Sequence, residues 1–408
     1  MQKSTDYTYD IAIIGGGIVG LASAYKLQKS YPDLSIIVFE KEDRLAAHQT
    51  GRNSGVIHSG LYYSPGSFRA RNCVNGRKQL VAFAKDHNIK HDVCGKVVVA
   101  VSEDELPRLD KIYKIGKANG LEGVEKIDAK QLKKIEPYAE GIAALWVPET
   151  GIIDFVGVTN KLADLIKEIN PKSDIKTSCE VKHFQRGEVT FLLTSQGNFY
   201  ARKLVFCGGL HSDRLAKKDN VKLDVRIVGF RGDYYDLSEQ GKKKVRNLIY
   251  PVPNPEFPFL GVHFTRMTDG TIECGPNAVF TFKREGYGKT DFNLKDTIEA
   301  LFYSGTWKLF FKHWRFGLNE YRRAFSKRLF LKELNRIIPS LTMDDIELGR
   351  SGVRAIALAG DGDVYEDFKI EYKDNSIHVL NAPSPAATAC LAIGDEVKAM
   401  AEKHFKLH

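Results

Sequence analysis

Three glycines and one carboxylate near the start of the chain have the spacing of a dinucleotide-binding motif. Gly15, Gly17 and Gly20 form GxGxxG, and Glu40 follows twenty residues after the last of them. In this motif the first glycine makes a tight turn, the second lets the backbone approach a pyrophosphate, and the third lets helix and strand pack closely. The helix N-terminus offers N–H groups to the phosphates. Glu40 can bind the ribose hydroxyls and disfavours a 2′-phosphate, so we expect FAD or NAD rather than NADP.

The elements around these residues occur in the order that the motif requires. A short apolar strand is predicted over Ile11–Ile14, a helix over Leu21–Lys29 and a second strand over Ser35–Phe39. The first strand shows no polar alternation, which is typical of a parallel strand buried on both faces. A tight turn without a nucleotide is the alternative, but the order strand, turn, helix, strand, acid favours cofactor binding.

A polar loop punctuated by glycines favours FAD over NAD. The stretch "HQTGRNSGVIHSGLYY", residues 48–63, has almost no helical or strand periodicity. A flavin is longer than a nicotinamide and needs further contacts, which polar side chains and close-approach glycines can supply. The loop offers Thr50, Asn53 and Ser54 as polar side chains, and Gly51 and Gly55 as glycines that allow close approach. It resembles the segment after the second strand in the D-amino-acid-oxidase superfamily of FAD enzymes.

Two later segments are expected to complete the cofactor site. An apolar strand over Leu204–Cys207 ends in Gly208, like the strand that closes the FAD domain in that superfamily. A helix is predicted from about Ala386, and its first N–H groups could stabilise the electron-rich N1–C2=O edge of a reduced flavin. The remaining expected cofactor contacts are Lys41, Val181, Ser384 and Ala387.

These elements predict an α/β fold with two domains. A discontinuous, Rossmann-like FAD-binding domain is expected from residues 1–90, 150–215 and 346–408. The stretches "GFRGDYYDL", "LIYPVPNPEFPFLGVHFT" and "TIECGPNAVF" are rich in β-branched and aromatic residues and read as antiparallel strands. We therefore expect an α+β substrate domain, with a mainly antiparallel sheet covering the flavin, from residues 91–149 and 216–345.

Composition narrows the cellular setting. No apolar run approaches the ~18 residues of a membrane span. The N-terminus is polar and resembles neither a signal peptide nor a transit peptide. The six cysteines form no CxxC pair, so we expect reduced thiols in a cytoplasmic protein without a metal site. The net charge of +9 fits anionic partners such as small acids, phospholipid or nucleic acid, or simply a solvated surface.

The chain resembles the L-2-hydroxyglutarate dehydrogenase/oxidase family nearly end to end. The resemblance rests on the loop quoted above and on "RIVGFRGDYYDL", "IYPVPNPEFPFLGVHFT", "GPNAVFTFKREGY", "GVRAIAL", "VYEDF" and "NAPSPAATA". Gly208 stands where relatives often have Ala, and the leading presequence of mitochondrial members is not seen, which favours a cytosolic member. The resemblance implies FAD-dependent oxidation of (S)-2-hydroxyglutarate to 2-oxoglutarate, with hydride transfer to flavin N5 and electrons passed to a quinone or oxygen.

The same resemblance suggests roles for individual residues. His58 is the expected base, because a neutral imidazole near the flavin can accept a proton near pH 7. His263 is its rival, and could instead bind the distal carboxylate or be satisfied within its sheet. Arg354, in "SGVRA", is expected to grip the C1 carboxylate with its planar fork. Weaker candidates for substrate contact are Tyr250, Tyr63, Arg231 and Ser384. His48 is a remote candidate for a covalent link to the flavin, and a hydrogen bond is the simpler expectation for its side chain.

Residues 306–341 mix aromatic and basic side chains at helical spacing. Such a segment fits a membrane interface with anionic lipid, which would favour a quinone acceptor. Helices packed on the second domain with a basic outer face are the equal alternative. Two other functions compete with the main one: a flavin oxidase of glycerol 3-phosphate or another small hydroxy or amino acid, and a flavin-dependent RNA-modifying protein. No nucleic-acid partner is expected, because no cysteine lies in a reactive motif.

Overall fold

The predicted strand–turn–helix–strand unit forms the centre of the first sheet. A computed structural model describes residues 7–254 and 261–407. Strand β1 (Thr8–Ile14) leads through the glycine turn into α1 (Ile18–Ser30) and then β2 (Ile36–Phe39). β1 lies between β2 and β12 (Gly197–Phe206) and is parallel to both. The middle of β1 is wholly buried because layers of structure cover both faces of the sheet.

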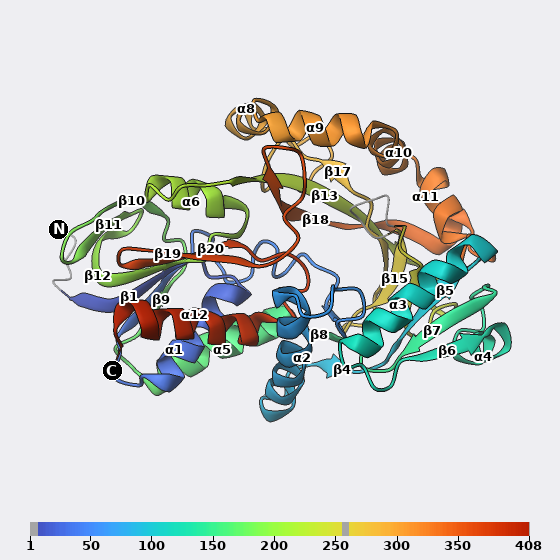
Figure 1. Cartoon of the computed structure of the whole chain (residues 1–408), viewed down its shortest axis with the longest axis horizontal. Coiled ribbons are helices and arrows are strands. Elements are labelled where there is room, and N and C mark those ends of the chain that lie inside the picture. Colours follow the sequence, from blue (N-terminus) through green and yellow to red (C-terminus); the bar gives the residue numbers. More distant parts are fainter. Residues whose placement is uncertain (1–6, 255–260, 408) are drawn as a thin grey trace.

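The rest of this sheet comes from distant parts of the chain. Its strands run in the order β10-β11-β12-β1-β2-β9, and β20 joins β12 while β19 joins β20. The remaining strands are β9 (Asp174–Lys176), β10 (Val181–Gln185), β11 (Thr190–Thr194), β19 (Lys369–Lys373) and β20 (Ser376–Asn381). Helices α1, α5 (Phe155–Ile169) and α12 (Cys390–Phe405) lie together on one face (Figure 1). The cofactor sheet is therefore discontinuous in sequence, as expected.

A second, mostly antiparallel sheet forms the other half of the molecule. Its strands follow the order β17-β13-β16-β15-β14-β5-β7-β6, with β18 paired to β13, and among the described strands of this sheet only β5 and β14 pair in parallel. They are β5 (Lys96–Ala100), β6 (Glu125–Asp128), β7 (Ala143–Val147), β13 (Val225–Leu237), β14 (Leu248–Pro251), β15 (His263–Arg266), β16 (Ile272–Gly275), β17 (Val279–Phe280) and β18 (Ile346–Ala359). A small sheet of β3 (Val56–Ile57), β8 (Gly151–Ile153) and β4 (His91–Asp92) lies beside it.

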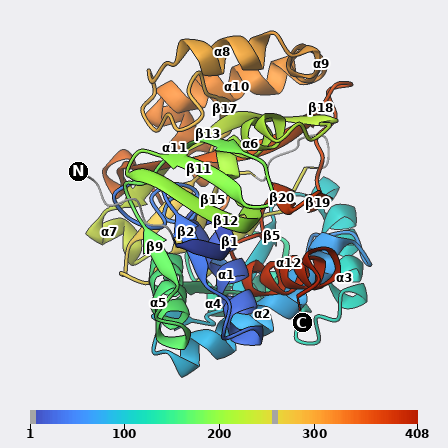
Figure 2. The same cartoon turned by 90° about the vertical axis from the view of Figure 1, so that its left-hand side faces the viewer.

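Helices cover the second sheet on its outer sides. Helices α8, α9 and α10 form a layer above β13 and β17, at one edge of the molecule (Figures 1 and 2). The remaining helices are α2 (Phe68–Asp86), which packs on α12, α6 (Ser212–Lys218), which packs on β12 and β20, and α3 (Leu106–Ala118), α4 (Ala129–Ile135), α7 (Glu239–Lys242), α8 (Leu294–Leu301), α9 (Ser304–Lys312), α10 (Trp314–Phe325) and α11 (Lys327–Leu334). No helix in the described ranges is both long and apolar enough to cross a bilayer.

Two sequence expectations differ from the structure. Strand β18 belongs to the second sheet along its whole pairing with β13, although the predicted division placed residues 346–359 in the FAD-binding domain. Helix α12 begins at Cys390, about four residues later than predicted, because residues 385–389 form turns first. The predicted strand through "PVPNPEFPFLG" lies partly outside the described residues, as does the start of the N-terminal segment.

Candidate active site

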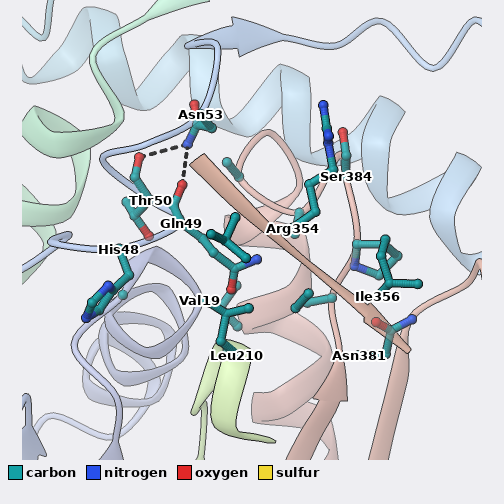
Figure 3. A pocket seen from close by; sticks show the side chains of 18 of the residues that line it. Val19, His48, Gln49, Thr50, Asn53, Leu210, Arg354, Ile356, Asn381 and Ser384 are labelled. Carbon is teal, nitrogen blue, oxygen red and sulfur yellow. Dashed lines mark hydrogen bonds between the residues drawn. The ribbon is translucent and has the colours of Figure 1, made fainter. Parts of the chain in front are cut away.

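A cavity of about 1580 Å³ lies between the two sheets. This volume exceeds the ~300–1,000 Å³ of a typical small-ligand pocket, so the cavity can hold an elongated cofactor together with a small substrate. Its wall combines the β1–α1 turn, the loop after β2, the ends of β12 and β20, and part of β18. In Figure 3, Gln49, Thr50 and Asn53 border it on one side and Arg354 and Ser384 on another.

The three glycines of the turn serve different purposes. Gly15 has φ +119°, and a Cβ there would lie 2.3 Å from the carbonyl oxygen of Cys207. A Cβ at Gly20 would lie 2.0 Å from the carbonyl oxygen of Gly15. At Gly17 an added Cβ meets only the Thr50 hydroxyl, at 3.4 Å, and would otherwise project beside the cavity. Packing therefore requires the first and third glycines, while the second leaves room for a ligand at the helix N-terminus.

Glu40 and Lys41 lie where β2 reaches the cavity. One carboxylate oxygen of Glu40 accepts a hydrogen bond from Gly16 N (2.9 Å), and the other accepts from Glu42 N (2.9 Å). These bonds hold the carboxylate against the cavity wall and leave further lone pairs for ribose hydroxyls. The Lys41 ammonium pairs with Glu42 (2.8 Å) and Glu285 (2.5 Å), so its charge is balanced within the protein.

The loop after β2 is held by its own side chains. The Thr50 hydroxyl accepts from Ile18 N at 3.0 Å, which ties the loop to the start of α1. The Asn53 amide donates to the carbonyls of Gln49 and Thr50 (Figure 3). Its oxygen accepts from Gly55 N. Asn53 therefore uses its polar atoms to shape the loop that borders the cavity.

One arginine that the sequence analysis missed fastens this loop to the second sheet. Arg350, on β18, donates to the carbonyls of Gly51 (2.8 Å) and Asn53 (2.7 Å) and pairs with Glu273. A Cβ at Gly352 would lie 2.2 Å from the carbonyl oxygen of Arg52, so the two backbones touch. An arginine two residues before a glycine and four before Arg354 was visible in "GRSGVRA", but no local rule gives it this partner.

His48 makes hydrogen bonds with both ring nitrogens. Its Nδ1 lies 2.6 Å from the Tyr287 hydroxyl and its Nε2 lies 2.8 Å from Glu42 Oε1. Nearby, burial raises the pKa of Glu285, but hydrogen bonds from His211 and Lys41 outweigh it and lower that pKa to about 2. His48 thus belongs to a dense hydrogen-bonded cluster. Both of its ring nitrogens have hydrogen-bond partners within the protein, and neither needs a covalent bond to the flavin.

The turn between β20 and α12 lines the cavity opposite the glycine turn. Ser384, Ala386 and Ala387 all contribute to the wall. The Thr388 hydroxyl accepts from His58 N (3.0 Å) and donates to the carbonyl of Val56 (3.1 Å). This turn therefore holds the segment that carries His58.

His58 lines the same cavity. Its Nε2 is 3.5 Å from the Ser384 hydroxyl. Burial, together with the charges of Lys96 and Arg69, lowers the pKa of His58 to about 3. The imidazole is thus neutral at physiological pH and can accept a proton.

His263 and Tyr250 lie side by side on neighbouring strands. Their ring centroids are 4.0 Å apart, and His263 Nδ1 lies 2.8 Å from the Gly261 carbonyl oxygen. That bond places the proton on Nδ1 and leaves Nε2 as an acceptor. Burial lowers the pKa of His263 to about 3, with help from the charges of Arg354 and Lys96. The two candidate bases, His58 and His263, therefore line one cavity as neutral rings.

Arg354 reaches the cavity from β18. Its Nη1 donates to the Asn277 carbonyl at 3.1 Å, and burial lowers the pKa of its guanidinium. Opposite it, a Cβ at Gly232 would lie 3.1 Å from Nη1, so the small residue makes room for the side chain. Tyr63 also lines the wall, and the guanidinium of Arg69 lies 4.5 Å from the centroid of its ring.

The remaining expected residues divide between the wall and the protein interior. Val181, Ser54 and Gly208 are in the wall, whereas Gly51 and Gly55 are not. Arg231 is also outside the wall, because it is buried in an ion pair with Asp233 (2.7 Å). The wall also includes aromatic side chains that the sequence analysis did not single out, Tyr62 and Tyr234.

Comparisons with known proteins agree on one family. The sequence profile of the FAD dependent oxidoreductase family (DAO) matches residues 10–400. An L-2-hydroxyglutarate dehydrogenase of Indibacter alkaliphilus is 44% identical over 398 residues, covering 97% of this chain and all of that protein. The mitochondrial L-2-hydroxyglutarate dehydrogenase of Homo sapiens is 41% identical over 424 residues, covering 100% of this chain and 91% of that protein.

Solved structures share the fold at lower identity. An FAD-bound L-alpha-glycerophosphate oxidase from Mycoplasma pneumoniae superposes with a TM-score of 0.78 and 24% identity, covering 97% of this chain and 94% of that one. A glycine oxidase from Geobacillus kaustophilus gives a TM-score of 0.73 and 16% identity, covering 97% and 95%.

Proposed function

This chain belongs to the L-2-hydroxyglutarate dehydrogenase family of FAD dependent oxidoreductases, and on that premise we propose that it oxidises L-2-hydroxyglutarate, the (S) enantiomer, to 2-oxoglutarate. FAD is its cofactor. The observation that carries the proposal is one cavity that joins the glycine turn at the helix N-terminus to a wall with a half-buried arginine and two neutral histidines. That arrangement supplies a cofactor cradle, a carboxylate ligand and a proton acceptor together.

The cofactor cradle consists of the glycine turn, Glu40 and the loop around Thr50. The open space beside Gly17 and the N-terminus of α1 suit a pyrophosphate, and Glu40 suits a ribose. FAD, when bound, supplies the acceptor for the hydride that leaves the substrate carbon. The turn with Ala386 and Ala387 lines the opposite wall of the same cavity.

His58 takes the hydroxyl proton of the substrate. In the free protein its low pKa keeps the ring neutral, but it also makes the protonated ring costly. Lys96 and Arg69 contribute to that cost through their charges. A bound dicarboxylate offsets these charges, so substrate binding raises the pKa of His58 and makes it a stronger base.

Arg354 binds the carboxylate next to the reacting carbon. Its guanidinium lines the cavity and is held by the Asn277 carbonyl, so it can orient the substrate as well as attract it. His263 and Tyr250 form the adjoining wall, where they limit the space around the substrate chain.

A dye-linked assay tests the substrate. The FAD-loaded protein should reduce an artificial acceptor with L-2-hydroxyglutarate and form 2-oxoglutarate, while the D enantiomer gives no turnover. Glycerol 3-phosphate is the necessary comparison, since a structural relative with the same fold is named for it. Turnover with glycerol 3-phosphate and none with L-2-hydroxyglutarate would replace the proposed substrate.

For the electron acceptor we propose a quinone reached at an anionic membrane surface. Helices α8, α9 and α10 expose aromatic side chains to an unusual extent: Phe302 is 85% exposed, Phe311 74%, Phe325 65% and Trp314 57%. Helix α9 contacts both α8 and α10, so these side chains come from neighbouring helices, and large exposed apolar patches are rare on proteins that meet only water. Exposed basic residues occur on the same helices, namely Lys308 and Lys312 on α9 and Arg315 and Arg322 on α10. Aromatic and basic side chains together suit the interface of an anionic bilayer.

Vesicle sedimentation tests this surface with a matched pair of variants. Phe311 and Leu348 are both 74% exposed, but Leu348 lies on β18 away from the three helices. Phe311→Ser should weaken binding to vesicles containing phosphatidylglycerol roughly 10- to 100-fold, since burying one aromatic ring is worth about 1.5–3 kcal/mol. Leu348→Ser should leave binding unchanged. Equal effects of the two variants, or no binding by the parent protein, would leave oxygen or a soluble acceptor as the electron sink.

A further inference from the structure

Lys96 is a buried cation beside the substrate end of the cavity. It is the first residue of β5, and its side chain is 1% exposed. Its ammonium lies 4.6 Å from the ring centroid of Tyr62 and 4.8 Å from that of Tyr250. Both tyrosines line the cavity. Within residues 7–254 and 261–407, no carboxylate oxygen lies within 4.0 Å of the Lys96 ammonium, so the two aromatic rings are the groups that face its charge.

The surroundings of Lys96 are otherwise those of an apolar core. Its cross-strand neighbours are Val147 and Leu248, and Val98 follows on the same face of β5. Burying a charge without a partner is unfavourable, and a methionine would fill the same volume without that cost. A lysine at this place destabilises the free protein, which points to a use for its charge in the bound state.

The missing counter-charge matches the chemistry of the substrate. A 2-hydroxy dicarboxylate brings two negative charges, and Arg354 accounts for the carboxylate beside the reacting carbon. The charge of Lys96 reaches both His58 and His263, so it acts on the same part of the cavity. We propose that Lys96 supplies the positive charge for the second carboxylate and so selects a dicarboxylate over hydroxy acids with a single carboxylate. This inference rests on the proposed function.

Binding of unreactive analogues tests this directly. Glutarate and pentanoate share a five-carbon chain and differ in one carboxylate, and their binding can be followed by the absorbance of the bound flavin. The parent protein should bind glutarate more tightly. Lys96→Met should weaken glutarate binding about 10- to 100-fold, as expected for loss of one charged partner, and leave pentanoate binding unchanged.

A second lysine in the same sheet provides the control. Lys126, on β6, lies 5.0 Å from the ring centroid of Tyr113, but its side chain is 49% exposed and pairs with Asp110 at 2.6 Å. Lys126→Met should change neither affinity. Equal weakening of both analogues by Lys96→Met, or no weakening of either, would overturn the proposal.

Stability and pH give readouts that a structural role would not produce. Lys96→Met should raise the melting temperature, because it removes an unpaired buried charge, whereas loss of a structural contact would lower it. Burial lowers the pKa of Lys96 to about 7. The dissociation constant for glutarate should therefore rise above about pH 7 in the parent protein and not in the variant.

The two proposals can fail separately. A protein that distinguishes glutarate from pentanoate through Lys96 but is not reduced by L-2-hydroxyglutarate would keep the dicarboxylate site and lose the substrate assignment. If the protein oxidises L-2-hydroxyglutarate but Lys96→Met does not change its preference for dicarboxylates, the substrate assignment is kept and the role of Lys96 is lost.

Discussion

Because the turn glycines have different roles, replacing each of them by alanine should have different effects on FAD binding and on the stability of the fold. Gly17→Ala should leave the fold of the cofactor-free protein intact and weaken FAD binding. Gly17 has φ −78° and ψ 173°, which alanine adopts freely, and the new Cβ meets only the Thr50 hydroxyl at 3.4 Å. The methyl group would intrude where the pyrophosphate approaches the helix. Loss of one or two charge-assisted hydrogen bonds there corresponds to about 1.5–3 kcal/mol, or roughly 10- to 100-fold in the dissociation constant.

Gly15→Ala should instead damage the fold. Its Cβ would lie 2.3 Å from a backbone oxygen that cannot rotate away, at φ +119°. The backbone conformation alone costs about 1–3 kcal/mol, and displacing β12 adds to it. We therefore expect a loss of about 3 kcal/mol or more in the free energy of unfolding, even without cofactor.

A third glycine serves as a control that separates the cost of the backbone conformation from the cost of the steric contact. Gly197, in the hairpin between β11 and β12, has φ +120° and nothing within 4 Å of an added Cβ. Gly197→Ala should cost only the conformational part and leave FAD affinity unchanged. The assay is thermal unfolding of the three apoproteins, followed by FAD titration with fluorescence quenching. Unchanged FAD affinity in Gly17→Ala would refute the cradle, and equal stabilities of Gly15→Ala and Gly197→Ala would refute the contact argument.

Four other predictions follow from the same contacts. His58→Ala should lower kcat about 10²- to 10⁴-fold while FAD stays bound, and near-normal turnover would move the base to His263. Arg354→Met should raise KM and lower kcat without releasing FAD; unchanged KM for L-2-hydroxyglutarate would remove it from the carboxylate site. Arg350→Met should weaken FAD binding several-fold, because the loop at Asn53 loses its anchor, and intact affinity would show that the loop holds itself. Finally, the folded-state pKa values of His58 and His263, about 3, lie below the ordinary 6.5, so the unfolded chain binds more protons in that interval. Stability of the apoprotein should fall as pH falls from about 6.5 toward 3, by up to about 1.4 kcal/mol per pH unit for each ring, and a flat profile would contradict the burial of both.

The cofactor half of the fold follows closely from local sequence rules. Hydrophobic runs, glycine spacing and an acid at the end of the second strand predict β1, α1 and β2 because each rule concerns residues near one another in the chain. The late start of α12 was missed because a small-residue stretch with two prolines is compatible with either helix or turns until its partners are known. The packing of α2 against this turn shows how tightly the turn is held. A Cβ at Gly76, on α2, would lie 2.6 Å from the Cα of Ala389.

The substrate half depends on long-range pairing that no local rule reveals. Strand β18 joins β13 across more than a hundred residues, and this pairing brings Arg350 to the loop at Asn53 and Arg354 to the cavity. Arg231 was a weaker candidate in sequence, and its side chain lies on the other side of β13 and pairs with Asp233. Lys96 gave one local signal, a charged residue at the head of an apolar run, whose meaning emerges only once Tyr62 and Tyr250 are placed around it.

The central claim is that this cavity oxidises L-2-hydroxyglutarate with FAD, and anaerobic reduction of the bound flavin tests it most directly. The purified, FAD-loaded protein is mixed with L-2-hydroxyglutarate in the absence of oxygen, and the flavin absorbance is followed in a stopped-flow instrument. We predict rapid bleaching with one 2-oxoglutarate formed per flavin, and none with the D enantiomer. A fully loaded flavin that stays oxidised with L-2-hydroxyglutarate, or that bleaches equally with both enantiomers, would contradict the account.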